Sequence, residues 1–192
     1  MNTKFSKTSF CIMFSVFLTI TFLTSLGWSA EFKADVIVDK DGKIYNGVAY
    51  VKDTNIRYEL KTEAGEEVII HRGDFGAQWT IYPNSGLYSE LWNYMSEDYI
   101  VVELNRNLNE IATKEFIGTE TVSGMLCDIY LYRFNDTSLG ELTVYYAKEL
   151  DHPIKIVLEK NDYRLTKEYK NIKMCTLKDS LFELPPGHTM LK

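Results

Sequence analysis

Apolar and polar residues alternate with a period of two over most of this chain, which is the pattern of β-strands with one buried face. Every second position is apolar in residues 32–38, and Asp41-Gly42 follows, a pair typical of tight hairpin turns because glycine tolerates a positive φ. Alternating segments separated by turn residues then recur at 43–52, 56–61, 67–72, 78–82 and 87–91. Strands spaced this closely predict an antiparallel meander.

The middle of the chain has a different period. No glycine or proline occurs between Trp92 and Thr113, and Leu104, Leu108 and Ile111 recur at the spacing of one helical face. We expect a helix over residues 96–113, with 99–102 as a strand in the alternative interpretation. Because its apolar face must be buried, we expect the segment 91–113 to cover the concave side of the sheet as a mobile lid.

Strands return at Lys114 and end near residues 134, 147, 159 and 174, so they form a second meander. The segment from Met125 to Phe134 is apolar on both faces, so we expect both of its sides to be covered. The predicted fold is mainly β (α+β): a strongly curved antiparallel sheet with a helical cover.

The first thirty residues lack this pattern. Lys4 and Lys7 precede an uncharged run from Ser9 to Leu26, and small residues lead from there to Glu31. These are the basic, apolar and cleavage regions of a secretory signal peptide. We therefore expect residues 1–30 to be removed and residues 31–192 to be exported as a single domain. An uncleaved membrane anchor is the alternative, because the run has about the minimum length of a spanning helix, roughly 18 residues.

Charge narrows the range of partners. Without the two leader lysines, 19 basic residues face 27 acidic ones, a net charge of −8. An acidic surface disfavours non-specific nucleic-acid binding, which requires cations that displace counterions from phosphates. It also disfavours an electrostatic grip on anionic lipid headgroups.

The chain shows no motif of a catalytic or metal site. Its three histidines are isolated, and it has no Cys-x-x-Cys pair, phosphate-binding glycine loop or serine nucleophile elbow. We predict no enzyme activity, no metal and no cofactor. Cys127 and Cys175 should lie at one end of the sheet, about 14 Å apart across three strand spacings. That is too far for a disulfide unless the sheet rolls up, so both a disulfide and two free thiols stay open.

Aromatic residues make up 14% of the chain and concentrate in its middle. Many will be ordinary core or sheet-surface residues. The more specific interpretation is an apolar ligand cavity on the concave face, because such sites are lined mainly by apolar and aromatic side chains. The residues that we expect to line it are Trp79, Ile81, Tyr88, Trp92, Met95, Leu104, Leu108 and Tyr130.

An ordered set of short motifs resembles the LolA-like periplasmic carriers, a superfamily that includes the outer-membrane lipoprotein-sorting proteins. The resemblance covers nearly all of residues 31–192 and is stronger to an uncharacterised branch than to the lipoprotein carrier itself. The motifs are Tyr50-Val-Lys52 with Ile56-Arg57, Asp74 with Trp79-Thr-Ile-Tyr82-Pro83 through Tyr88-Ser-Glu90, Ile117-Gly118 through Gly124 with Cys127 and Tyr130, Ala147-Lys-Glu-Leu150 with Pro153-Ile-Lys155, Tyr169-Lys-Asn-Ile-Lys173, and Leu181-Phe-Glu-Leu-Pro-Pro-Gly187.

This resemblance implies a half-open β-barrel whose apolar concavity is covered by helices and accepts acyl chains. We therefore expect a non-enzymatic carrier or sensor for a lipid or an acylated lipoprotein, with transient contacts to the membrane or to envelope proteins. Arg57 and Arg72 are the candidate contacts for an anionic group of the ligand. The alternative is an envelope protein–protein interaction module whose concave face is filled by its own side chains.

Overall fold

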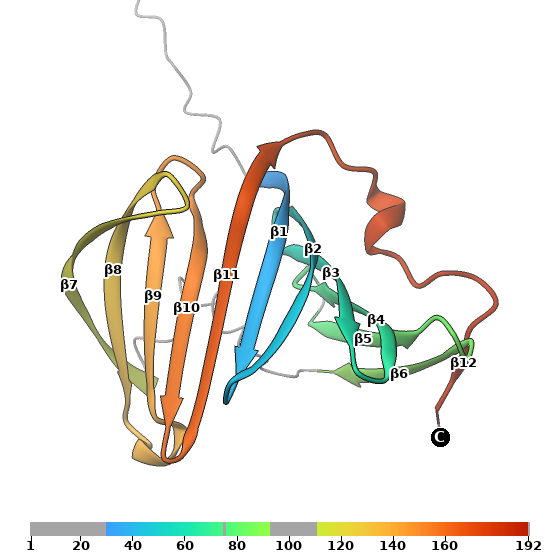
Figure 1. Ribbon diagram of the computed structural model, residues 1–192, viewed down its shortest axis with the longest axis horizontal. Helices are drawn as coiled ribbons and strands as arrows, with labels where there is room; N and C mark the ends of the chain where they lie inside the picture. The colour runs from blue at the N-terminus through green and yellow to red at the C-terminus, as the bar shows by residue number, and fades with distance from the viewer. Residues whose placement is uncertain (1–29, 75, 93–110, 192) are drawn as a thin grey trace, which may run out of the picture.

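The chain forms one sheet of twelve strands (Figure 1). The computed structural model describes residues 30–74, 76–92 and 111–191. Its first half contains β1 (Glu31–Lys40), β2 (Lys43–Lys52), β3 (Asn55–Thr62), β4 (Gly65–Arg72), β5 (Ala77–Tyr82) and β6 (Leu87–Trp92). Its second half contains β7 (Ala112–Val122), β8 (Met125–Phe134), η1 (Thr137–Leu139), β9 (Glu141–Ala147), β10 (His152–Lys160), β11 (Tyr163–Met174), η2 (Asp179–Phe182) and β12 (Thr189–Met190).

The six strands predicted for the first meander are confirmed. In β1 the burial of side chains alternates as the sequence pattern predicts. Phe32, Ala34 and Val36 are buried, whereas Lys33 and Asp35 between them are exposed. The predicted hairpin turn is also confirmed, with φ of 52° at Asp41 and 83° at Gly42. The Asp39 carboxylate accepts a hydrogen bond of 2.8 Å from the Gly42 amide, which stabilises this turn.

The second meander is confirmed with one correction at its start. Ala112 and Thr113 begin β7 and do not end a helix. They pair with Phe134 and Arg133 of β8, and Ala112 packs against Phe134, so sheet pairing and core packing outweigh the local helical spacing. Within the described residues, the helical elements are the short 3-10 helices η1 and η2, and Ile111 is one further residue with helical conformation. These elements do not form a helical cover over the concave face. The rest of the expected helix lies outside these residues.

Strand β8 is covered on both faces over only part of its length. Cys127 and Tyr132, which lie on opposite faces, are buried as expected. Leu126 is 63% exposed, and the prediction of full coverage is wrong there. The reason is that this residue lies near the end of the sheet, beside the exposed strand β7, whose residues 113–117 and 119–121 are also exposed.

The two meanders join through β1 and β11, giving the order β12-β6-β5-β4-β3-β2-β1-β11-β10-β9-β8-β7. Neighbouring strands are antiparallel except for β12 and β6. Because β12 and β7 end the order without pairing to each other, the strands form one long sheet that is not closed. Its strands form two walls on either side of β1 and β11 (Figure 1).

The sheet is strongly curved at its centre. Tyr58 of β3 and Tyr169 of β11 are three strands apart in the order, a distance of about 14 Å in a flat sheet. Their hydroxyl oxygens nevertheless lie 2.6 Å apart, so the face that carries them is the concave one. Gly47 permits a close approach of β2 and β3, because a Cβ atom there would lie 2.2 Å from the Glu59 carbonyl oxygen.

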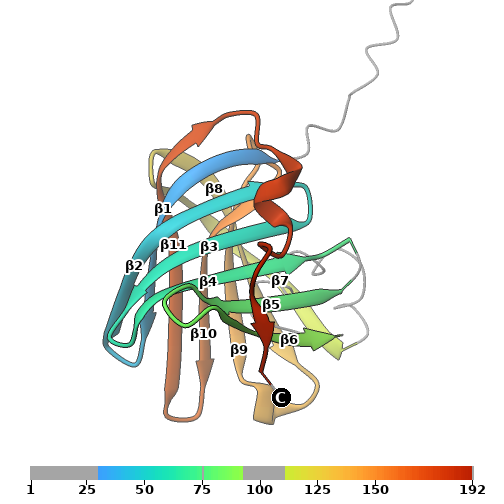
Figure 2. The ribbon, with the colours of Figure 1, turned by 90° about the vertical axis from the view of Figure 1, so that its right-hand side faces the viewer.

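The C-terminal segment after β11 crosses the outer, convex face of β2 to β5 (Figure 2). Leu177 and Phe182 are buried there against Val68, Ile70 and Ile81. The segment ends at β12, which pairs in parallel with β6. One half of the sheet is therefore covered on its outer side by the chain itself.

Candidate functional site

Two side-chain rows run across the concave face of the second meander. Backbone pairing aligns one row from β7 to β11 as Phe116, Tyr130, Val144, Ile156 and Lys167. The adjacent row is Lys114, Tyr132, Leu142, Leu158 and Leu165. The middle of each row is apolar, and Val144 and Ile156 are buried. Each row thus places a continuous apolar stretch on the concave face of the second meander.

A polar aromatic cluster closes the inner end of these rows. The Lys167 ammonium donates a hydrogen bond of 3.0 Å to the Tyr58 hydroxyl oxygen and lies 5.3 Å and 5.6 Å from the ring centroids of Tyr58 and Tyr169. The His71 ring packs edge-on against Tyr58. All four side chains are buried, so they fill the concave face where the two meanders meet.

Burial also changes the acid–base properties of this cluster. His152 stacks on Tyr169 and packs edge-on against Phe32, with ring centroids 6.2 Å and 5.4 Å away. Burial lowers the pKa of His152 to about 4, so its imidazole is neutral at neutral pH. Burial raises the pKa of the Tyr169 hydroxyl above its usual value, so this hydroxyl is protonated at neutral pH.

The outer end of the rows forms a rim along the edge strand β7. The Lys114 ammonium lies 3.9 Å from the centroid of the Tyr130 ring, and Phe116 packs edge-on against the same ring. The Tyr130 hydroxyl donates to Asp128, and burial together with this contact raises the Tyr130 pKa. Lys148 forms an ion pair of 2.9 Å with Asp128, so that carboxylate is compensated.

The structure does not bring the predicted cavity residues together. Of those that it describes, Tyr130 lies on the concave face. Trp79, Ile81, Tyr88 and Trp92 project from the opposite face, as the register from β3 to β6 shows. The first three of them pack in the cluster that the C-terminal segment covers. Their role as ligand contacts stays a prediction, as does that of Met95, Leu104 and Leu108, which lie outside the described residues.

Arg57 and Arg72 also lie on the convex face, where both hold the C-terminal segment. The Arg57 guanidinium donates to the Leu181 carbonyl oxygen at 3.2 Å and pairs with Glu59. Arg72 donates to the Phe182 carbonyl oxygen and to both carboxylate oxygens of Asp74. The sequence-based role of these arginines, contact with an anionic group of a ligand, stays a prediction.

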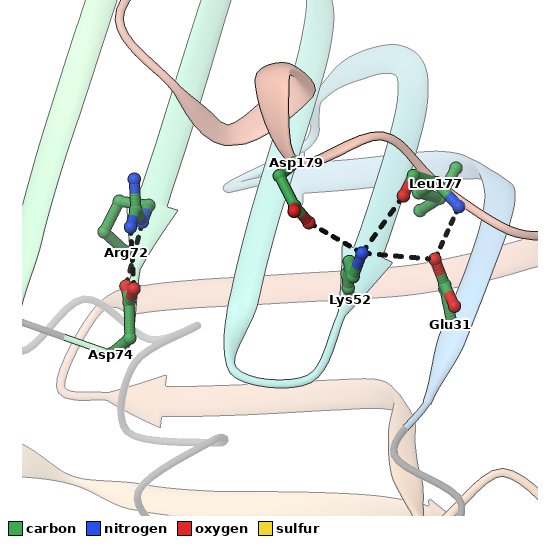
Figure 3. A network of polar contacts seen from close by, with 6 residues as sticks. All are labelled: Glu31, Lys52, Arg72, Asp74, Leu177 and Asp179. Carbon is green, nitrogen blue, oxygen red and sulfur yellow. Dashed lines mark hydrogen bonds and ion pairs between the residues drawn. The ribbon is translucent and has the colours of Figure 1, made fainter.

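Lys52 completes this attachment (Figure 3). Its ammonium contacts the Asp179 carboxylate at 2.7 Å and the Leu177 carbonyl oxygen at 3.1 Å. The pKa of Lys52 is raised and that of Asp179 is lowered by their hydrogen bond. The Glu31 carboxylate accepts a hydrogen bond from the Leu177 backbone amide, and its Oε1 atom lies 3.7 Å from the Lys52 ammonium. The segment is thus held by backbone groups as well as by its apolar side chains.

Sequence reasoning missed Lys114 and Lys167. Both stand at positions where the alternation calls for an apolar residue, since Lys114 follows Ala112 and precedes Phe116, and Lys167 lies between Leu165 and Tyr169. A lysine at a position where the alternation of the strand is apolar could have indicated these two residues. Their role could not be predicted, because a strand pattern does not identify the residues that pair with them.

The described residues contain no group of three or more His, Cys, Asp or Glu side chains placed to hold a metal ion. Cys127 is buried and Cys175 is exposed, and both are free thiols, which decides between the two alternatives left open by the sequence. Over residues 30–74, 76–92 and 111–191, no helix has the length and apolar character needed to cross a membrane.

No protein-family model and no curated protein matches this chain. Solved structures match its fold, among them an uncharacterized conserved protein from Thermus thermophilus (10% identity, 85% of this chain and 90% of that chain, TM-score 0.60). The Pseudomonas aeruginosa MucA/MucB complex matches at 8% identity over 85% of this chain, which spans 59% of that chain (TM-score 0.56). The LolA superfamily protein NE2245 from Nitrosomonas europaea matches at 12% identity over 81% of this chain and 91% of that chain (TM-score 0.44). At these identities the likeness concerns the fold alone, and the resemblance to the LolA-like carriers stays a prediction.

Proposed function

We propose that this chain is an exported, non-enzymatic binding protein that holds an acyl chain of a lipid or lipoprotein on the concave face of its second meander, as a carrier or sensor. The observation that carries the proposal is the apolar row from Tyr130 through Val144 to Ile156 in a sheet that does not close. Each methylene group of a ligand buried there contributes about 0.8 kcal/mol. The signal-peptide pattern of residues 1–30 supports export.

The position of the site follows from what fills the rest of the concave face. Phe32, Tyr58 and Tyr169 occupy the centre, where they are at most 2% exposed. That cluster leaves no room for a ligand. The open edge at β7 leads to Tyr130, which is only partly buried. Farther along the row Val144 and Ile156 are 2% and 1% exposed, so the acyl chain must displace the groups that cover them.

Mass spectrometry of lipid extracts from the purified protein, with titration of a fluorescent fatty acid, tests the proposal. Tyr130→Glu places a charge in the apolar row and should weaken uptake of the fluorescent fatty acid at least tenfold. Tyr145→Glu is the matched control, because Tyr145 is a partly buried tyrosine that pairs with Ile129 on the opposite face of β8. No co-purified acyl species and no fatty-acid uptake by the wild-type protein would refute the proposal.

An envelope protein–protein interaction module is the second candidate. Two observations favour it: the packed centre of the concave face and the fold likeness to MucB, which has been solved in complex with MucA. Cross-linking in envelope fractions with wild-type protein and Tyr130→Glu distinguishes the candidates. A protein partner captured by a chain that takes up no acyl probe favours the interaction module.

A further inference from the structure

The rim at β7 presents a positive charge on an aromatic surface. The Lys114 side chain is exposed, and its ammonium lies 3.9 Å from the Tyr130 ring centroid and 5.6 Å from that of Tyr132. Such cation–π contacts hold an ammonium in place without neutralising its charge. Lys114 therefore differs from a lysine that extends freely into solvent, because its position relative to the apolar rows is defined.

The acidic groups around this rim are engaged by other cations. Asp128 pairs with Lys148, and Glu115 pairs with Arg133 at 2.5 Å. Among the described residues, no carboxylate forms an ion pair with Lys114. In a chain of net negative charge, this leaves a local positive charge beside an apolar surface.

An exposed aromatic side chain extends the same surface. Phe116 is 56% exposed and packs edge-on against Tyr130 with a centroid distance of 5.8 Å. It precedes an irregularity in the pairing of β7 with β8, between Phe116 and Gly118, where φ of Gly118 is 148°. Bulges of this kind bend an edge strand and redirect its side chains. The rim thus combines one ammonium with two aromatic rings next to the start of an apolar row.

We propose that Lys114, Tyr130 and Phe116 form the head-group site for an amphiphile with a single anionic head group, specifically a long-chain fatty carboxylate. This inference rests on the proposed acyl-chain function. The carboxylate contacts the Lys114 ammonium at the rim, and the chain passes over Tyr130 toward Val144 and Ile156, about 10 Å farther along the row. Charge complementarity selects the head group, and the apolar row accepts the tail.

Desolvation explains why the head group binds at this end of the row and not at the other. Lys167 also ends the row, but it is only 7% exposed. A carboxylate placed there would lose its hydration, which costs several kcal/mol per ion. At the rim the head group stays in contact with water while the tail is buried.

Paired titrations with a fluorescent long-chain fatty acid and its methyl ester test this site. Lys114→Met removes the charge and keeps a long apolar side chain over Tyr130. It should weaken binding of the acid about three- to fivefold, as expected for an exposed ion pair, and leave binding of the ester unchanged. Lys155→Met is the matched control, because Lys155 lies 4.7 Å over the Tyr145 ring and pairs on the opposite face. It should change neither affinity.

Any other outcome of these titrations would overturn the inference, and the outcomes differ in what they leave standing. Equal effects of Lys114→Met on acid and ester, or no effect on either, would show that Lys114 does not recognise the head group, while the proposed acyl binding survives. If the wild-type protein binds neither probe, the proposed function fails as well. If ligand-free wild-type protein sediments with phosphatidylglycerol vesicles and Lys114→Met does not, the rim is a membrane contact and not a ligand site.

Discussion

The buried His152 makes the stability of this protein depend on pH. Its ring is 5% exposed and packs between Phe32 and Tyr169, where burial lowers its pKa from 6.5 to about 4. Asp151, the charged group that acts on it most, shifts the pKa in the opposite direction and does not offset burial. As pH falls, the unfolded chain binds this proton before the folded chain does.

The size of the effect follows from the two pKa values. The contribution of His152 is fully present above pH 6.5 and is lost as pH falls toward about 4. With about 1.4 kcal/mol for each pKa unit, the folded state loses about 2 kcal/mol from this group by pH 5 and about 3 kcal/mol by pH 4. These amounts are a large part of the stability of an ordinary domain.

Urea unfolding at about pH 7.5 and about pH 5 measures this loss. Carboxylates add their own pH dependence, so the comparison is between wild-type protein and His152→Gln. The stability difference between the two should change by about 2 kcal/mol over this range. If His152→Gln loses as much stability as the wild-type protein, the ring is not held neutral by burial and the reasoning is refuted.

Three further substitutions test the packing. Phe182→Ala should destabilise the protein by about 3 kcal/mol in thermal unfolding and expose the C-terminal segment to protease, because Phe182 is buried against the convex face. Gly47→Ala should cost about 1–3 kcal/mol in urea unfolding, since its Cβ would collide with the Glu59 carbonyl; unchanged stability would mean that β2 and β3 can separate freely. Tyr169→Phe removes the hydroxyl that contacts Tyr58 and should cost about 1 kcal/mol by the same measurement; an effect near zero would mean that water replaces this contact.

Large apolar and aromatic residues of similar chemistry lie on both faces of the sheet and have different roles there. Trp79, Ile81 and Tyr88 share with Tyr130 the properties on which the sequence prediction rests, because all four are large apolar or aromatic residues in strands. In the structure the first three bury the C-terminal segment, and Tyr130 lies on the other face. Arg57 and Arg72 follow the same division, since their guanidinium groups hold carbonyl oxygens of that segment. Side-chain chemistry alone does not decide which face of a sheet is concave.

The strands themselves are encoded locally. Alternation in segments such as 32–38 and turn pairs such as Asp41-Gly42 act over a few residues, so the strand order within each meander could be predicted. The start of β7 could not, because Ala112 has helical spacing with Leu108 and becomes part of a strand only through pairing with β8. The local pattern competes there with a contact to residues about twenty positions away.

The sequence by itself determined that this chain is a β protein of two meanders, with an acidic composition and no recognisable catalytic motif. Only the tertiary structure decided that β1 pairs with β11, that the sheet curls until Tyr58 reaches Tyr169, and that the C-terminal segment covers the convex face. The physical reason is the distance along the chain over which each interaction acts. Alternation indicates that a strand has an apolar face, whereas what packs against that face is set by the curvature of the sheet and by contacts between residues more than a hundred positions apart.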